Sequence, residues 1–277
     1  MMKKTRKFLG SIGYYVFVAF VIAFFGIPLI WLLVTPFNSQ ATLSLEFPTQ
    51  PTLDNFRQVF ENKFAVQALA KNNLILAVGT MIGITFIATL TAYALSRARI
   101  PGRNFLSYTL ILFSSVVTGT AAMVPIFLII SKMGLIDSHL GVILVFIGGF
   151  LPSAIFIMRD FVDGIPRSYE ESAMVAGARP LNVLGDVVLP LVRPGMMVIA
   201  IWAFVQSWGA FLVPFILLRS PEKMPASTAI YSFYTEAGTP NIRLFAAYSL
   251  LYALPVVILY LLVNWRYGFS FFGGIKR

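Results

Sequence analysis

Cysteine is absent from this sequence of 277 residues, histidine occurs once, and charged residues make up only 12% of the chain. Without cysteine there is no disulfide, no thiolate metal site and no cysteine nucleophile. The single histidine, His139, provides too little for an imidazole-rich metal site, and we expect it to lie in a solvated turn. These shortages argue against hydrolytic, redox and metal chemistry in this chain.

Apolar residues are abundant instead. They make up 58% of the chain, whose mean hydropathy is +0.83, and the share of charged residues is well below the roughly 25% of a soluble domain. This composition predicts an integral membrane protein in contact with lipid. The net charge of +10 does not indicate nucleic-acid binding, because the basic residues lie at the ends of apolar segments, where they set membrane topology.

Six apolar runs are long enough to cross the hydrocarbon core of a membrane, which is about 30 Å thick. They predict an all-α protein with a single transmembrane domain over residues 1–277. We expect the spans at about residues 12–34, 73–96, 105–130, 140–158, 196–218 and 244–263. The first run exceeds the roughly 7–15 apolar residues of a cleaved signal and is therefore counted as a span.

The segments between the spans differ in charge. Residues 35–71 are predicted to lie outside the membrane and to contain a short amphipathic helix capped by Asp54. The two chain ends, the turn at residues 97–103 and the loop at residues 159–195 together hold two thirds of the 21 Lys and Arg residues. The positive-inside rule therefore places both termini on the cytoplasmic side of the cell (inner) membrane.

Proline occurs within five of the predicted spans, and each proline frees a backbone carbonyl that other groups must satisfy. Two interpretations stay open: ordinary kinked packing, or, at Pro125 and Pro214, kinks that line a central cavity. The five residues are Pro28, Pro125, Pro152, Pro214 and Pro255.

The loop between spans four and five begins with the pattern of a short helix. Ser168 and Glu171 fit a capping box, in which each side chain satisfies a free amide at a helix start. Gly177 suits the left-handed residue that stops the helix. Tyr169, Ala173 and Ala176 then share one mostly small face, which a second protein's backbone could approach closely.

A second short helix is expected after Gly177. Pro180 suits its first turn and Pro190 its end, and Leu181, Leu184 and Val188 recur on one face. Two interpretations of Glu171 stay open, capping alone or capping together with a charge contact to a partner. Glu170 and Glu171 cannot both point inward on so short a helix, so one of them is left for a basic partner.

The loop resembles a known motif. Glu171-Ser172-Ala173, Gly177 and Val187-Val188-Leu189-Pro190 look like the EAA motif of the membrane subunits of binding-protein-dependent ABC importers, with Ser172 in the place of an alanine. Further matches point to the shorter six-span subunit of carbohydrate importers of the maltose and trehalose type. These matches are Ala92 to Arg97 with Pro101-Gly102, Val124 to Phe127 with Gly134-Leu135, Ile165-Pro166, and Leu189-Pro190-Leu191 with Pro194-Gly195.

The resemblance implies a translocation subunit and not an enzyme. Two permease subunits, expected to be different chains, form the pore, and each inserts its coupling helices into a cleft on a cytoplasmic ATPase dimer. An external sugar-binding protein delivers the solute, which crosses by alternating access. ATP and Mg are expected in the ATPase alone, because this chain has no Gly-x4-Gly-Lys-Ser/Thr phosphate loop and is expected to bind no cofactor.

The resemblance also assigns residues to the ATPase contact. In it Glu171 is the acidic contact, Ala173 and Gly177 are close-packing positions, and Lys276-Arg277 in the basic tail form a second contact. The full predicted coupling set is Glu170, Glu171, Ala173, Gly177, Leu181, Leu184 and Pro190.

This chain departs from the family at two places. Ala176 stands where the family usually has Asp, so an interaction specific to that Asp is lost or replaced. In span five the family often has Trp-Asn-Asp/Glu, whereas this chain has Trp208-Gly209-Ala210, which weakens the case for polar sugar contacts there.

A sugar site in the membrane needs side chains that pair with hydroxyl groups and an aromatic face. Among the candidates we favour Gln206, Trp208 and Tyr252. Polar groups in lipid also bond to one another between helices, so this second interpretation stays open. The candidates are Gln206, Ser207 and Trp208 in span five, Tyr248 and Tyr252 in span six, and Ser114, Ser115 and Thr118 in span three.

Other functions remain as alternatives. The first is an ABC importer for a different solute, such as glycerol phosphate, an amine or a peptide. A second is an uncoupled channel or a membrane scaffold. An enzyme ranks third, because catalytic groups within lipid usually show as ionisable residues, and the predicted spans contain almost none.

Overall fold

The computed structural model describes residues 2–98, 102, 105, 109, 112, 120–234 and 238–267. Within these ranges the chain is helical, with one isolated β-bridge between Tyr234 and Pro240. Part of the predicted third span, including Ser114, Ser115 and Thr118, lies outside the described residues, as does the tail at Lys276-Arg277. The chain divides into two compact units, Met1–Val66 with Ile230–Arg277, and Gln67–Ala229.

The first unit combines the beginning and the end of the chain. Asn55 is buried and its Nδ2 donates to the carbonyls of Pro36, at 2.9 Å, and Asn38, at 3.0 Å, which ties the short helix α2 to the turn after α1. The hydroxyl of buried Tyr248 donates to the carbonyl of Ala65 at 3.2 Å and links α14 to α3. The elements of this unit are α1 (Met2–Val34), η1 (Thr35–Phe37), α2 (Asp54–Glu61), α3 (Lys63–Gln67), η6 (Ile230–Phe233) and α14 (Ile242–Tyr267).

Several predictions for this unit are confirmed and two are wrong. The first apolar helix ends at Val34 as expected, and α2 and α14 are present. The predicted loop at residues 35–71 is too long, because helix resumes at Lys63 and runs through a π-helical segment into α4. Asp54 is the first residue of α2 and not its cap, since Leu53 occupies the cap position without a side-chain bond.

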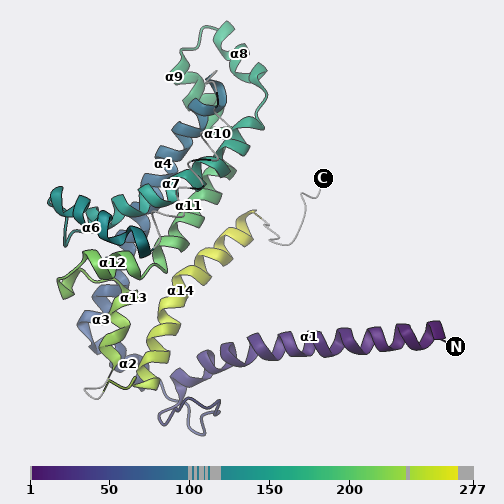
Figure 1. Ribbon diagram of the computed structural model, residues 1–277, viewed down its shortest axis with the longest axis vertical. Helices are drawn as coiled ribbons and strands as arrows, with labels where there is room; N and C mark the ends of the chain where they lie inside the picture. Colours follow the sequence, from purple (N-terminus) through teal and green to yellow (C-terminus); the bar gives the residue numbers. More distant parts are fainter. Residues whose placement is uncertain are drawn as a thin grey trace. The chain divides into compact units, whose positions relative to one another are not determined.

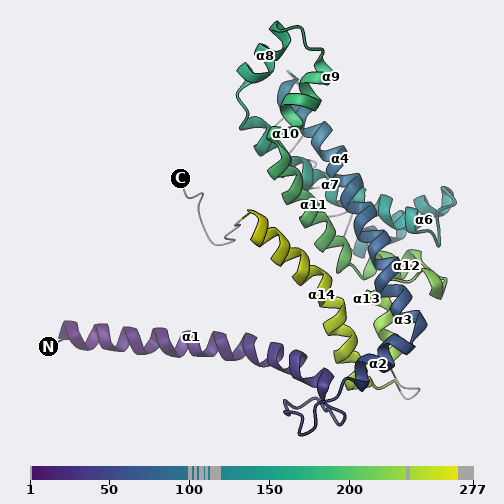
Figure 2. The same ribbon diagram turned by 180° about the vertical axis from the view of Figure 1, so that it is seen from behind.

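The second unit is built around three helices, α4 (Leu74–Arg97), α7 (His139–Asp163) and α11 (Arg193–Trp208), which run side by side in both ribbon views (Figures 1 and 2). Their apolar side chains form one buried cluster that includes Ala88, Met158 and Ile199. The other elements are η2 (Ala68–Asn73), η3 (Thr120–Ala122), α6 (Met123–Lys132), α8 (Arg167–Val175), α9 (Pro180–Asn182), η4 (Val183–Val188), α10 (Leu189–Leu191), α12 (Leu212–Leu217), η5 (Pro221–Lys223) and α13 (Ala226–Ala229).

Two glycines allow α4 and α7 to pack closely. Gly79 and Gly83 are four residues apart on α4, and they face Ile143 and Ile147 of α7. A Cβ on Gly79 would lie 2.6 Å from the Cδ1 of Ile143, and one on Gly83 would lie 2.5 Å from that of Ile147. Small residues at this spacing are typical of helix pairs in membranes, where dispersion contacts replace the hydrophobic effect as the main attraction.

The predicted second and fourth spans correspond to α4 and α7, and Ser138 caps the start of α7, where its hydroxyl accepts from the amide of Leu140. The predicted fifth span is wrong in extent. Helix α11 ends at Trp208, and a break at Gly209 and Ala210 separates it from α12. Pro214 lies in the first turn of α12, where its missing amide costs no helical bond, so the chain breaks before it and does not kink through it.

Four described helices are long and apolar enough to cross a membrane. A fifth is obtained if Pro180–Leu191 and Arg193–Trp208, which meet at 72°, are counted as one bent span. The prediction of an all-α membrane protein is confirmed, and the predicted third span, at residues 105–130, lies partly outside the described residues. The four helices are Gly13–Phe37, Lys63–Arg97, His139–Asp163 and Ile242–Trp265.

The turn between α6 and α7 is held by Asp137, which has a left-handed backbone with a φ of 56°. Its carboxylate accepts from the backbone amides of Arg219 at 2.9 Å and Ser220 at 3.0 Å, and from the ammonium of Lys223 at 3.1 Å. The Ser220 hydroxyl and these donors hold the pKa of the carboxyl well below its usual range. His139 is half-buried here, with its Nε2 2.9 Å from the carbonyl of Lys223, so it is not the free loop residue that was expected.

Candidate functional site

The loop between α7 and α11 contains a short helix, α8, that ends at a glycine as predicted. Gly177 has a φ of +90°, which a residue without a Cβ adopts readily. The amide of Ala178 donates to the carbonyl of Ala173 and the amide of Gly177 to that of Met174, each at 3.0 Å. This pair of bonds is a Schellman motif, which satisfies carbonyls at the helix end.

The predicted capping box at the start of α8 is absent. The helix begins at Arg167, with Pro166 in the cap position, and no side chain caps it. Pro166 has the extended backbone of a residue that precedes a helix, and it moves the start upstream of Ser168. Ser168 therefore lies inside the first turn, and Glu171 has no reciprocal capping bond to make.

The second half of the loop differs from the predicted regular helix. Pro180 occupies the first turn of α9 as expected, but the chain then enters the π-helical segment η4, in which the amide of Leu189 donates to the carbonyl of Leu184. Pro190 lies in α10, which ends one residue later at Leu191, where the chain bends by 72° into α11, so the predicted end at Pro190 is confirmed to within one residue.

The π-helical turn also changes which residues face inward. Val183 and Val188, five residues apart, are buried, and Leu184 is partly buried against the same cluster. Leu181, which is predicted to share a face with Leu184 and Val188, is 80% exposed. A period of 3.6 residues was assumed for this face, and the extra residue in the turn rotates Leu181 away from it.

The two adjacent glutamates of α8 have different environments. Glu170 is buried, and its Oε1 accepts from the guanidinium of Arg97 at 2.6 Å while its Oε2 accepts from the hydroxyl of Tyr93 at 3.0 Å. Glu171 is exposed. Removal of one partner from a buried ion pair typically costs about 3–5 kcal/mol, because the other charge is left without compensation.

Arg97 is the centre of a polar cluster at the end of α4. Its Nη2 donates to the carbonyls of Ile165, at 3.0 Å, and Val162, at 3.3 Å, at the end of α7, and its Nη1 donates to the hydroxyl of Ser96 at 3.0 Å. The guanidinium of Arg167 donates to the carbonyl of Ser96 at 3.3 Å. One cation therefore joins the ends of three helices, α4, α7 and α8.

A second acidic side chain completes this cluster. Asp163, the last residue of α7, accepts from the hydroxyl of Ser96 and, at 3.2 Å, from the Nε of Arg159. Together with the Arg97 contacts, these bonds hold the ends of α4 and α7 to each other beneath α8.

The outer surface of the loop is apolar and exposed. Val175 is 89% exposed and Leu181 80%, and Tyr169 and Met174 are about half exposed. We call these four residues the loop patch. Glu171 on the same short helix is also exposed, as are Ala176 and Gly177. The loop patch lies on two neighbouring short helices, with Leu181 on α9 and the other three residues on α8, and large exposed apolar patches mark interaction sites.

The predicted substrate residues of α11 differ in environment. Gln206 is exposed, whereas Ser207 and Trp208 are buried. The hydroxyl of Ser207 donates to the carbonyl of Ala203 at 2.6 Å, within its own helix, and the Trp208 ring stacks on Phe204 with ring centroids 5.3 Å apart. Of the three side chains, that of Gln206 is the most accessible to a solute.

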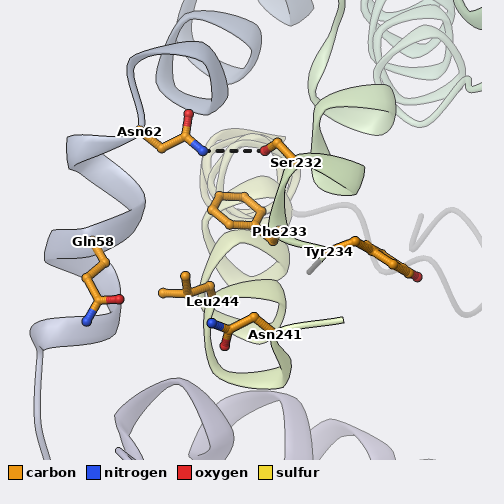
Figure 3. Close-up of a pocket in the computed structure, with 7 residues that line it drawn as sticks. All are labelled: Gln58, Asn62, Ser232, Phe233, Tyr234, Asn241 and Leu244. Carbon is orange, nitrogen blue, oxygen red and sulfur yellow. Dashed lines mark hydrogen bonds between the residues drawn. The ribbon is translucent and has the colours of Figure 1, made fainter. Parts of the chain in front are cut away.

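Tyr252 belongs to the other unit, where it is half-buried on α14, one turn from buried Tyr248. The same unit holds a pocket of about 270 Å³ between α2, η6 and the start of α14 (Figure 3). Asn62 Nδ2 approaches Ser232 Oγ at 3.5 Å across it. The lining residues carry no charge, so the pocket suits neutral groups; they are Gln58, Asn62, Ser232, Phe233, Tyr234, Asn241 and Leu244.

Sequence reasoning missed the role of Arg97 and Tyr93. Both lie in a stretch that supported the resemblance, but a basic residue at the end of an apolar run was interpreted as a topology signal. The available clue was the spacing of Tyr93 and Arg97, which places both side chains on one face of a helix end. Their shared partner, Glu170, is 73 residues beyond Arg97 and 77 beyond Tyr93, and no local pattern identifies it.

Comparisons with known proteins agree with this architecture. The family described as "Binding-protein-dependent transport system inner membrane component" matches residues 5–270. The galactooligosaccharides transport system permease protein GanQ of Bacillus subtilis is 29% identical over 265 residues, covering 94% of this chain and 93% of that one. The maltodextrin transport system permease protein MdxG of the same organism is 30% identical over 262 residues, covering 94% of each chain.

A solved structure shows the same fold. It belongs to a bacterial ABC transporter involved in the import of the acidic polysaccharide alginate, with a TM-score of 0.80 and 22% identity, and the match covers 95% of this chain and 98% of that one. The matched family spans nearly the whole sequence, including both described units and the loop between α7 and α11. The chain therefore belongs to the family of inner membrane components of binding-protein-dependent transport systems.

Proposed function

We propose that this chain is a pore-forming subunit of an ATP-driven importer for a neutral di- or oligosaccharide such as maltose or trehalose, with the loop between α7 and α11 as its contact to the ATPase. The observation that carries the proposal is the contrast between two neighbouring glutamates, of which Glu170 is bound internally and Glu171 is presented outward beside the loop patch. ATP and Mg would be bound by the partner, and this chain would catalyse no reaction.

The uncharged spans support a neutral solute. No Asp, Glu, Lys or Arg occurs at residues 74–96, 140–158, 196–208 or 244–265. A phosphate ester or an amine would need a compensating charge in a pathway through lipid, because a lone ion there is costly. The similarity to permeases for galactooligosaccharides and maltodextrin supports the same class of solute.

The exposed loop patch supports the proposal of a protein partner. This partner would bind on the side of the membrane where most Lys and Arg residues lie. The side chains of Val175 and Leu181 expose apolar surface to water. Burial of this surface in a cleft of a partner protein would be favourable, because it removes the apolar area from water. Positive-inside topology places this loop and both termini in the cytoplasm, where an ATPase dimer would bind. A second permease chain would complete the pore, and an external sugar-binding protein would deliver the solute.

The test is co-purification of the ATPase with detergent-extracted permease. Glu171→Lys reverses the outward charge, and Leu181→Ser removes apolar surface from the loop patch. We expect each change to release most of the ATPase, while the permease keeps its thermal stability because both side chains are exposed.

Lys63→Gln is the control, since it changes one charge on α3, outside the loop, and should leave the complex intact. If the ATPase stays bound to both loop variants with full stimulation of ATP hydrolysis, the coupling role assigned to this loop is wrong. If the protein is an uncoupled channel or a scaffold, no ATPase should co-purify even with the unchanged chain.

A further inference from the structure

Helix α8, in the loop between α7 and α11, is attached to its unit in two ways. Residues 164–166 join it covalently to the end of α7, whereas its polar links to α4 are made by side chains. Glu170 bonds to Arg97 and Tyr93 of α4, and Arg167 bonds to the carbonyl of Ser96. A displacement of α8 is therefore transmitted to α7 through the backbone and to α4 through these side chains.

We propose that the Arg97–Glu170 ion pair is a permanent joint that makes α8 and the end of α4 move together, so that movement imposed on the loop by the ATPase is passed to α4. The proposal rests on the proposed function, because it takes α8 as the helix on which the ATPase acts. Arg97 and Glu170 are positioning residues in this view, since neither is required to touch the ATPase or the solute.

The geometry suits a joint that stays closed. The side chain of Glu170 is 8% exposed and that of Arg97 16%, so water has little access to either charge. Separation of such a pair would leave both charges buried without a partner, which makes the open arrangement costly. The guanidinium also holds two carbonyls at the end of α7, and these fix its plane independently of Glu170.

Arginine is required at this position for a chemical reason. Its planar fork donates to Glu170 and to the carbonyls of Val162 and Ile165 at the same time, whereas a lysine ammonium provides a single point charge on a flexible chain. Arg97→Lys should therefore keep the charge balance and lose part of the rigidity.

The test uses the complete transporter in proteoliposomes, with the ATPase, the second permease chain and the binding protein, and measures solute transported per ATP hydrolysed. We expect Arg97→Gln and Glu170→Gln each to lower this ratio about tenfold, a size within the usual range of coupling between distant sites. Arg97→Lys should give an intermediate ratio, and the swap Arg97→Glu with Glu170→Arg should recover most of the loss. ATPase binding, measured in parallel, should be unchanged in all of these variants, because Glu170 is buried against Arg97 and is not available as the direct ATPase contact that the resemblance implies.

A cross-link distinguishes a permanent joint from a contact that opens during transport. Because the chain has no cysteine, Arg97→Cys with Glu170→Cys introduces the two thiols alone, and a short bismaleimide can bridge them. We expect low coupling before cross-linking and recovered coupling afterwards. A cross-linked complex that cannot transport would overturn the proposal, because α8 and α4 would then have to separate. Failure of the glutamine variants to fold would leave this cross-linked pair as the deciding measurement.

The exposed pair of Arg57 and Glu61 on α2 is the matched control. These side chains lie 3.0 Å apart and are 77% and 64% exposed, so Glu61→Gln should leave the ratio unchanged. If Arg97→Gln and Glu170→Gln both transport as much solute per ATP as the unchanged chain, the proposal of a joint is wrong. Loss of ATPase binding in Glu171→Lys, with normal binding in Arg97→Gln and Glu170→Gln, would support the proposed function. The proposal of a joint would then be decided by the amount of solute transported per ATP hydrolysed.

Discussion

At the scale of single residues, α8 separates two glutamates by direction. Consecutive residues of an α-helix point about 100° apart, so only one of the pair can face the polar cluster at the end of α4. Glu170 faces it and is neutralised by Arg97, and Glu171 is left on the surface. Two residues of the same type, one position apart, thereby have an internal and an external role.

The environment of Asp137 predicts how the stability of the protein depends on pH. Its pKa is lowered by the donors of Ser220, Arg219 and Lys223, so the ionised form stabilises the fold at neutral pH. This contribution is fully present above the unfolded-state pKa of about 3.9, and it is lost as the pH falls below that value toward the folded-state pKa.

Thermal unfolding of the detergent-solubilised protein between pH 7 and pH 3 checks this prediction. Asp137→Asn should melt at a lower temperature than the unchanged chain at pH 7, and the difference should shrink as the pH approaches 3. A difference that stays constant over this range would show that the charge of Asp137 contributes nothing.

At the scale of elements, the loop between α7 and α11 depends on turns that widen or stop a helix. The Schellman motif at Gly177 ends α8, and the π-helical segment η4 precedes the short helix α10, which ends just after Pro190. The same segment buries Val183 and Val188 and leaves Leu181 on the surface. Irregular turns thus decide which apolar residues belong to the core and which remain for a partner.

Helix α7 offers a matched pair of glycines for a second prediction. A Cβ on Gly141 would be forced against the backbone carbonyl of Leu135, which cannot move aside as a flexible side chain does, whereas Gly148 has open space around it. Gly141→Ala should therefore lower the stability by about 1–3 kcal/mol. Gly148→Ala should be neutral or stabilising by up to about 1 kcal/mol, because alanine favours helix.

Thermal melts of the two variants in one detergent provide the comparison. Equal melting temperatures would mean that the turn at Leu135 yields freely to a methyl group.

At the scale of the whole molecule, the predicted spans carry no Asp, Glu, Lys or Arg, which is the basis for proposing a neutral solute. Gln206 is the candidate for contact with the solute, because it is exposed on α11 while its neighbours Ser207 and Trp208 are buried. Gln206→Leu should lower substrate-stimulated uptake about 2- to 10-fold, the effect of one or two lost neutral hydrogen bonds.

Uptake of a panel of mono- and disaccharides by the reconstituted transporter measures this effect. Val205→Ala on the same helix is the control and should leave uptake unchanged, since Val205 has no polar group. Unchanged uptake in Gln206→Leu for every sugar would remove Gln206 from the pathway.

The sequence by itself determined the class of protein, the positions of most spans, the stop at Gly177 and the presence of a helical loop with two glutamates. These follow from composition and from patterns of a few neighbouring residues, which act locally. Tertiary structure decided which glutamate is buried, because the partner of Glu170 lies 73 residues away in the chain. It also decided the break after Trp208, the start of α8 before Ser168 and the π-helical turn at η4, since packing and backbone hydrogen bonding outweigh local helix preferences at these places.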